Sequence, residues 1–315
     1  MKKCCFKINP PSTFFLFILV FSANTLFSQH INSYKKKGNI TIASCQFPVS
    51  EDLQSNATWI MDQMESAHDS GAHVVHFPEC ALSGYPGVDM QTLDYIDWSK
   101  LRIYTDSIMK LAKRLKIWVV LGSIHPLEEG YKPMNCLYVI DPNGEIVDRY
   151  DKRFCTNGDL NFFCAGDHFS VFEINSVKCG LLICYDVRFP ELYREYSKLD
   201  VDVVFQSFYN ARQKPGGIHP KIMPLTAQAR AATNHFYMSL TNSSAQSSWP
   251  CHLITPDGLI QSKLEADLPG ILISEVDLTD EFYDASKAFR DKAIEGKLSS
   301  EKSPETKRYK TRNSL

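Results

Sequence analysis

Residues 177–191 have the sequence Val-Lys-Cys-Gly-Leu-Leu-Ile-Cys-Tyr-Asp-Val-Arg-Phe-Pro-Glu. The apolar run Val177–Ile183 predicts a buried strand, and Pro190 marks the opening of a helix that we expect to end at Leu199. Cys184 therefore lies at a sharp junction between strand and helix. Such a junction exposes the side chain and brings backbone N–H groups near the sulfur, which predicts a lowered thiol pKa. A buried, inert cysteine is the common alternative.

The same succession of strand and helix recurs on both sides of this stretch. Asn39–Phe47 alternates apolar and polar residues as strands do, Glu51–Ser70 is rich in helix formers, and His73–Phe77 predicts a buried strand. Further strands are expected at 117–121, 136–140, 145–148 and 201–205, with helices at 104–115 and 222–234 and hairpin turns at 141–144 and 255–258. This order predicts an α/β fold of mixed sheets whose helices cover one face, in two halves able to pack sheet to sheet.

Composition excludes several classes of protein. Of 315 residues, 44% are hydrophobic and 22% are charged, as in a well-cored globular protein. The 34 basic and 36 acidic residues give a formal net charge of −2, so we expect no nucleic-acid partner. Residues 291–315 lose their apolar side chains and predict a charged, solvated tail.

The N-terminal residues resemble a targeting signal. The apolar run Phe14–Phe21 follows Lys2, Lys3 and Lys7, and small and polar residues continue to Ser28. This order predicts a secretory signal peptide over residues 1–28 and export to the periplasm or the extracellular space. An uncleaved anchor is the alternative; after cleavage we expect no stable membrane insertion.

Cysteine spacing gives no support for a metal site. Of ten cysteines, Cys4 and Cys5 lie in the signal segment, and the other eight are scattered without any Cys-x-x-Cys pair. We therefore expect no metal. In an exported protein, a cysteine that performs chemistry must escape disulfide pairing.

Three segments carry side chains suited to acyl-transfer chemistry. Glu79 directly follows the strand His73–Phe77, where a carboxylate aimed into a cleft is placed to act as a general base. Lys152 follows the strand at 145–148, where a fixed ammonium can hold the oxyanion of a tetrahedral intermediate. Cys184 is the third. Taken singly, Glu79 is more simply interpreted as a helix cap or a surface acid, and Lys152 as a solvated lysine. The prediction of a catalytic site therefore depends on the combination of all three residues.

Together these segments resemble the nitrilase, or carbon-nitrogen hydrolase, superfamily across residues 38–290. The glutamate motif of that family corresponds to Phe77–Glu79, its lysine motif to Tyr150–Arg153 and its cysteine motif to Cys184–Glu191, in the same order and at similar spacing. Its Arg-Ala-x-x-Asn helix corresponds to residues 230–234. The resemblance implies a four-layer α-β-β-α sandwich and a reaction without metal or organic cofactor.

The resemblance also implies roles for individual residues. Cys184 would be the nucleophile and Glu79 the general base, while Lys152 and the backbone N–H of Tyr185 would hold the oxyanion. Many members have a second glutamate shortly before a Pro-Gly-Asp turn. Asp159 stands nearest to that position, but the turn has Ala in place of Pro. Asp159 either performs this role with a shorter reach or lies in a surface loop.

Arg188 has two interpretations. A guanidinium is well shaped for bidentate capture of a substrate carboxylate, as an ω-amide or an N-carbamoyl acid would require. Alternatively, Arg188 pairs with Glu191 or another acid and fixes the turn after Cys184, and we favour this structural role.

A tyrosine follows Cys184, whereas true nitrilases commonly have tryptophan there, so the resemblance is to the amidase-like branch. It implies hydrolysis of small non-peptide amides, of ω-amide or N-carbamoyl type, through a Cys-Glu-Lys triad and a thioester, with release of ammonia or an amine. The alternatives are an acyltransferase and a non-catalytic binding protein. Members are usually homodimers or higher homo-oligomers, and residues 277–296 could contribute to such a contact.

Overall fold

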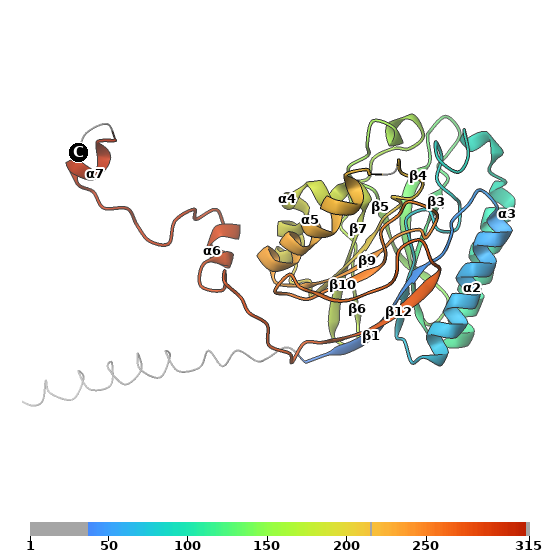
Figure 1. Ribbon diagram of the computed structural model, residues 1–315, viewed down its shortest axis with the longest axis horizontal. Helices are drawn as coiled ribbons and strands as arrows, with labels where there is room; N and C mark the ends of the chain where they lie inside the picture. Colours follow the sequence, from blue (N-terminus) through green and yellow to red (C-terminus); the bar gives the residue numbers. More distant parts are fainter. Residues whose placement is uncertain (1–36, 215, 313–315) are drawn as a thin grey trace, which may run out of the picture. The chain divides into compact units, whose positions relative to one another are not determined.

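The computed structural model describes residues 37–214 and 216–312 (Figure 1). The predicted signal peptide over residues 1–28 lies outside this range. Within it, no helix combines the length and the apolar character that crossing a bilayer requires. The chain from Lys37 onward forms one unit.

The first of two six-stranded sheets has the strand order β12-β1-β2-β3-β4-β5. Its strands are β1 (Asn39–Gln46), β2 (Val74–His76), β3 (Trp118–His125), β4 (Met134–Ile140), β5 (Ile146–Asp151) and β12 (Gly270–Asp277). The three central strands β1, β2 and β3 run parallel, and the outer pairings are antiparallel. The sheet is therefore mixed, as the sequence predicted.

The second sheet repeats this arrangement in the order β11-β10-β9-β8-β7-β6. Its strands are β6 (Val171–Ile174), β7 (Val177–Ile183), β8 (Val203–Ser207), β9 (Tyr237–Thr241), β10 (His252–Ile254) and β11 (Ile260–Lys263). Again the central strands β7, β8 and β9 are parallel and the outer pairings antiparallel. The carboxyl ends of parallel strands share one edge of each sheet, where functional residues are expected.

Helices cover the outer face of each sheet. The helices α2 (Leu53–Asp69) and α3 (Trp98–Leu115) share a hydrophobic core with the first sheet, whereas α4 (Pro190–Lys198) and α5 (His219–Asn234) pack on the second (Figure 1). Apolar side chains of the two sheets meet in a single cluster between them. The result is the four-layer α-β-β-α sandwich that the family resemblance implied. Short helices α6 (Arg290–Ile294) and α7 (Lys307–Lys310) lie in the C-terminal segment.

A buried histidine joins the two sheets. His76, in β2, forms hydrogen bonds through Nε2 with Ser207 Oγ at 2.9 Å and through Nδ1 with Ser239 Oγ at 2.8 Å, both residues of the second sheet. Burial lowers the pKa of His76 to about 3, so the imidazole is neutral. These bonds fix the relative position of the two sheets at the strand ends that carry the site.

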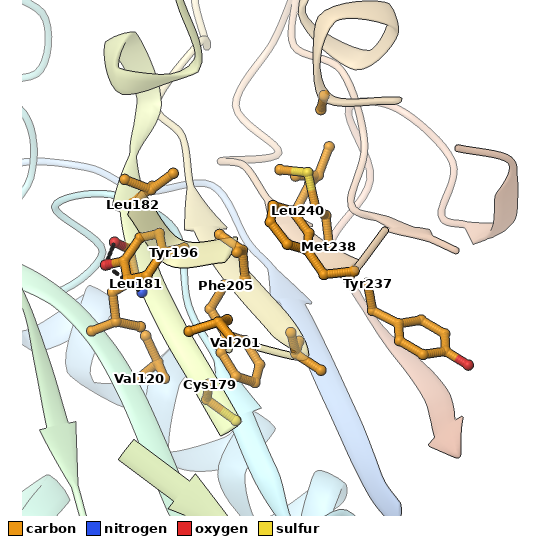
Figure 2. Packing of buried hydrophobic residues seen from close by; sticks show 14 of the residues in the cluster. Val120, Cys179, Leu181, Leu182, Tyr196, Val201, Phe205, Tyr237, Met238 and Leu240 are labelled. Carbon is orange, nitrogen blue, oxygen red and sulfur yellow. Dashed lines mark hydrogen bonds between the residues drawn. The ribbon is translucent and has the colours of Figure 1, made fainter. Parts of the chain in front are cut away.

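A tyrosine on α4 fixes the strand before Cys184. Beyond Gly180, where the pairing of β7 with β6 ends, Tyr196 Oη donates to Leu181 O at 2.5 Å and accepts from Leu181 N at 3.1 Å (Figure 2). A Cβ on residue 180 would lie 2.7 Å from the Tyr196 ring, so only glycine allows this close approach. The end of β7 is thereby held firmly.

Candidate active site

Glu79 lies three residues beyond the end of β2 and is fully buried. The turn that carries it packs on β3: Leu82 N donates to Gly122 O at 3.0 Å, and a Cβ at position 122 would lie 1.9 Å from Pro78 O. Glycine at 122 is therefore required for this turn to approach the sheet. Cys80, next to Glu79, has a positive φ of 53°, a strained conformation of the kind found at functional sites.

Lys152 lies immediately beyond β5, on a backbone held on both sides. Its N–H donates to Asn135 O, and its carbonyl accepts from Gly166 N, each at 2.9 Å. The side chain is fully buried and points to the carboxylates of Glu79 and Asp159, with Nζ 2.8 Å from an oxygen of each. The lysine and glutamate motifs, 73 residues apart, therefore meet in one ion cluster.

Asp159 begins a short 3₁₀ helix (Asp159–Asn161) and is only 2% exposed. Its Oδ2 accepts from Thr156 N at 2.8 Å as well as from Lys152, and its Oδ1 accepts from the Tyr85 hydroxyl. The surface-loop interpretation of Asp159 is therefore wrong, because the side chain turns inward to the lysine. The loop thus places the Asp159 carboxylate beside Lys152, as the second carboxylate next to that lysine.

Burial and the neighbouring charges shift the pKa of each group in this cluster. Burial raises the pKa of Glu79 and outweighs the opposing effect of Lys152. Burial also favours a neutral Lys152, but the neighbouring acidic groups outweigh it and hold the pKa of the ammonium well above its ordinary value. Lys152 and the Tyr85 hydrogen bond outweigh burial at Asp159 and lower the pKa of that carboxyl. Glu79 is thus the group of the cluster best suited to accept a proton.

Cys184 opens a 3₁₀ helix (Cys184–Arg188) directly after β7, with φ 41° and 8% exposure. Burial raises the pKa of its thiol, and the charge of Glu79 adds to this while Lys152 opposes it. The predicted lowering of the thiol pKa is therefore wrong. The junction is buried and faces two carboxylates. Both features raise the thiol pKa by more than the nearby backbone N–H groups lower it. Formation of a thiolate here would require a neighbouring base to take the thiol proton.

The turn after Cys184 is anchored by Asp186 rather than exposed. Asp186 Oδ2 accepts from Ile183 N at 3.0 Å and from the Tyr150 hydroxyl at 2.8 Å, and Oδ1 accepts from Phe154 N at 2.9 Å. Burial raises the pKa of this carboxyl to about 6. The aspartate thus ties the cysteine turn to the strand and loop that flank Lys152. Tyr185 is half-buried, and its N–H lies in the first turn of the 3₁₀ helix, where N–H groups lack partners within the helix.

Arg188 does not pair with Glu191 in the described part of the chain, and its half-buried guanidinium has no hydrogen bond or ion pair to another described residue there. Arg230 fixes the turn instead, because its Nε donates to Val187 O at 3.2 Å and its Nη2 to Arg188 O at 3.5 Å. The preferred structural interpretation of Arg188 is therefore wrong. Arg230 belongs to the Arg-Ala-x-x-Asn segment at residues 230–234, at the end of α5.

Several side chains of the site were not predicted. Asn135, in β4, donates through Nδ2 to Glu79 Oε1 at 2.8 Å. Glu79 Oε2 is buried and has no hydrogen-bond partner among the described residues, so it is free to take a proton. Tyr85 lies between β2 and α3, Asn210 lies in the loop after β8, and Trp249 lies in the loop between β9 and β10. These residues could not be predicted, because their hydrogen-bond partners in the site are distant in the sequence.

The described residues hold no group of three or more His, Cys, Asp or Glu side chains arranged to bind a metal ion. Their cysteines are all free thiols, and all but Cys155 and Cys164 are buried.

Comparison with known proteins identifies the class. Residues 41–281 match the family model described as carbon-nitrogen hydrolase. The chain therefore belongs to the carbon-nitrogen hydrolase family, in the amidase-like branch of the nitrilase superfamily. This confirms the resemblance inferred from the three motifs and the prediction of a carbon-nitrogen hydrolase.

Among its relatives, 2-oxoglutaramate amidase of Bacillus subtilis is 30% identical over 174 residues, which are 53% of this chain and 64% of that protein. Omega-amidase NIT2 of Mus musculus is 29% identical over 257 residues, 75% of this chain and 88% of that protein. The chain thus spans less than two thirds of the first relative. An amidase from Nesterenkonia sp. AN1, solved with an acetamide moiety on its active-site cysteine, superposes with a TM-score of 0.68 at 20% identity, covering 84% of this chain and 98% of that one. That likeness shows the fold.

Proposed function

We propose that this protein hydrolyses small non-peptide amides, of ω-amide or N-carbamoyl type, through Cys184, Glu79 and Lys152, and releases ammonia or an amine. The observation that carries the proposal is the buried cluster in which Lys152 Nζ lies 2.8 Å from both Glu79 and Asp159. The charges of this cluster act on the pKa of the Cys184 thiol. The family membership and the ω-amidase relatives support it.

The first half of the reaction forms a thioester. Glu79 accepts the proton of the Cys184 thiol as the sulfur attacks the carbonyl carbon, and the carbonyl electrons move to oxygen. Lys152 and the Tyr185 N–H hold that oxyanion. When it collapses, the C–N bond breaks, and Glu79 returns its proton to the leaving nitrogen. Ammonia or an amine departs and the acyl group stays on Cys184.

The second half releases the acid. Glu79, again a carboxylate, takes a proton from water as the water oxygen attacks the thioester carbonyl. The same donors hold the second oxyanion. Its collapse breaks the C–S bond, and the proton on Glu79 passes to the sulfur. The carboxylic acid leaves and the thiol is restored.

Asp159 keeps Lys152 charged through this cycle. Whenever Glu79 is protonated, the lysine loses one of its two counter-charges, and Asp159 at 2.8 Å supplies the other. The Tyr85 hydroxyl and Thr156 N–H hold that aspartate in place. Asp159 is thus proposed to perform the role of the second glutamate with a shorter reach.

Arg188 is proposed to bind the carboxylate of the substrate. It lies four residues beyond Cys184 and is half-buried, and no hydrogen bond or ion pair joins its side chain to another described residue. An arginine without a carboxylate partner, four residues from a nucleophile in the sequence, is suited to capture a carboxylate from a ligand.

The test is ammonia release by the chain from about Gln29 onward, across simple amides, ω-amides, N-carbamoyl acids and nitriles, with and without hydroxylamine as a second acceptor. We expect ammonia from ω-amides or N-carbamoyl acids and free acid as the main product. Hydroxamate in place of acid would favour acyl transfer. Absence of product from every compound, with folded protein, would favour the binding-protein alternative.

Export and self-association are part of the proposal. We propose that the mature protein begins near Gln29, outside the cytoplasm, and forms a homodimer or larger homo-oligomer. N-terminal sequencing of protein recovered from the cell exterior and light scattering of the purified chain test these two points.

A further inference from the structure

An asparagine amide lies against the reactive sulfur. Asn210, in the loop after β8, has its Nδ2 3.7 Å from Cys184 Sγ, and the two residues are 7% and 8% exposed. At this distance an N–H can donate to sulfur. The same Nδ2 also lies 3.2 Å from Tyr209 O, so its two hydrogens have two acceptors.

A tryptophan determines which end of the amide faces the sulfur. Trp249 Nε1 lies 3.1 Å from Asn210 Oδ1, and Trp249 is 3% exposed. An indole N–H only donates, so it must meet the amide oxygen and leave the NH₂ group facing Cys184. The Trp249 ring packs edge-on against Phe208, with centroids 4.7 Å apart, and cannot swing away freely.

The two loops that carry Asn210 and Trp249 are joined by one residue. Asn242 Oδ1 accepts from Asn210 N at 2.8 Å, and Asn242 Nδ2 donates to Trp249 O at 2.9 Å. Asn242 is fully buried at the end of β9. The donor facing Cys184 is therefore held by its own backbone and by its side-chain partner.

We propose that Asn210 is a further catalytic residue, whose side-chain N–H donates to the Cys184 sulfur as it becomes negative. Trp249 is the positioning residue that keeps the amide in the donating orientation. The consequence for turnover rests on the proposed function, whereas the effect on the thiol does not.

The charges around the sulfur explain the need for a neutral donor. Cys184 is within electrostatic reach of Glu79, Asp159, Tyr85 and Lys152, of which only Lys152 is positive. That lysine is already shared by two carboxylates. Transfer of the thiol proton to Glu79 moves the negative charge to sulfur, and a hydrogen bond from Asn210 stabilises the thiolate without adding charge. Loss of such a bond lowers the thiolate fraction by about 10- to 100-fold.

The test is the pH dependence of Cys184 alkylation by 2-chloroacetamide, followed by peptide mass spectrometry. The thiolate displaces chloride and forms a thioether, so the rate reports the thiolate and needs no amide turnover. Asn210→Leu removes the donor at a similar side-chain size and adds no charge beside the sulfur. Trp249→Phe keeps the ring and frees the amide to rotate. Trp118→Phe, at a partly buried residue that stacks on Phe172, is the matched control.

We expect alkylation at pH 7 to slow at least tenfold in Asn210→Leu, with its pH midpoint moved upward, and to slow less in Trp249→Phe. The Trp118→Phe variant should stay within twofold of wild type. Asn210→Ala replaces Asn210→Leu if circular dichroism shows the latter unfolded. Unchanged midpoints in folded variants of Asn210 and Trp249 overturn the inference, even if their activity falls.

The outcome is separable from that of the proposed function. If the wild type releases no ammonia from any amide but the Asn210 and Trp249 variants shift the alkylation profile, the inference stands and the proposed function fails. If the wild type hydrolyses amides and the profile does not move, the function stands and the inference fails.

Discussion

Lys152 Nζ lies 2.8 Å from Glu79 Oε1, and neither side chain has any solvent exposure. Asp159 lies at the same distance from the lysine on its other side, so one ammonium serves two buried carboxylates. Removing one partner of a buried ion cluster leaves charge without compensation, which costs more than the cluster itself contributes. The stability of the protein and its chemistry therefore depend on the same lysine.

Lys152→Met keeps the length of the side chain and removes the charge. We expect a loss of about 3–5 kcal/mol in the free energy of unfolding, because Glu79 and Asp159 would then be buried without a counter-ion. Urea unfolding measures it. Lys198→Met is the control: its pair with Glu195 is about half exposed, and its loss should cost about 1 kcal/mol or less. Equal losses in the two variants would contradict a charged cluster.

The rate of amide hydrolysis should depend on pH through Glu79. Burial raises the pKa of this carboxyl above its ordinary value of 4.5, and only the carboxylate can accept the thiol proton. Activity should therefore fall as pH decreases, with its midpoint above 4.5. Glu79→Gln should lower kcat by about 10²- to 10⁴-fold and remove this acid limb. A Gln variant that retains the limb would assign it to another group.

Tyr85→Phe removes one donor to Asp159. Asp159 has a lowered pKa in the folded protein, so its interactions stabilise the fold above the ordinary pKa of 3.8 and are lost as pH falls through the folded value. The variant should lose about 1–3 kcal/mol of unfolding free energy at pH 7, and the difference from wild type should shrink in acid. Denaturant unfolding at both pH values checks this. Tyr131→Phe, at a residue 70% exposed, should change neither value.

Arg188→Gln tests the proposed carboxylate contact. We expect KM for an ω-amide with a free carboxylate to rise about tenfold or more, and KM for a neutral amide to change little. The matched control is Arg194→Gln, since Arg194 Nη1 is already engaged with Thr233 O at 2.9 Å. Equal effects on the charged and neutral substrates would show that Arg188 does not bind the carboxylate.

Much of the fold could be predicted because its signals are local. The helix formers of Glu51–Ser70 predicted α2, and the apolar run Val177–Ile183 predicted β7. The turns at 141–144 and 255–258 predicted the two hairpins. The prediction for α3 began at residue 104, although the helix starts at Trp98, because the side chain of Asp97 caps it by accepting from Lys100 N at 3.0 Å.

The site was predictable as a set of residues but not as an electrostatic environment. Glu79, Lys152 and Cys184 each follow a strand, and a cysteine after a strand suggested an activated thiol. Its burial beside Glu79 and Asp159 reverses that pKa shift, and burial of this kind depends on segments distant in sequence. For the same reason the sequence did not reveal that Trp249 orients Asn210, 39 residues away.

The most direct test of the central claim is the rate of ammonia release by Cys184→Ala relative to wild type, with Cys164→Ala as the matched control. Cys164 is a free, half-buried thiol for which the mechanism has no role. We predict that Cys184→Ala lowers the rate by about 10⁴-fold or more while its unfolding curve stays close to wild type, and that Cys164→Ala keeps nearly full activity. A Cys184→Ala protein that releases ammonia within tenfold of wild type would contradict the account.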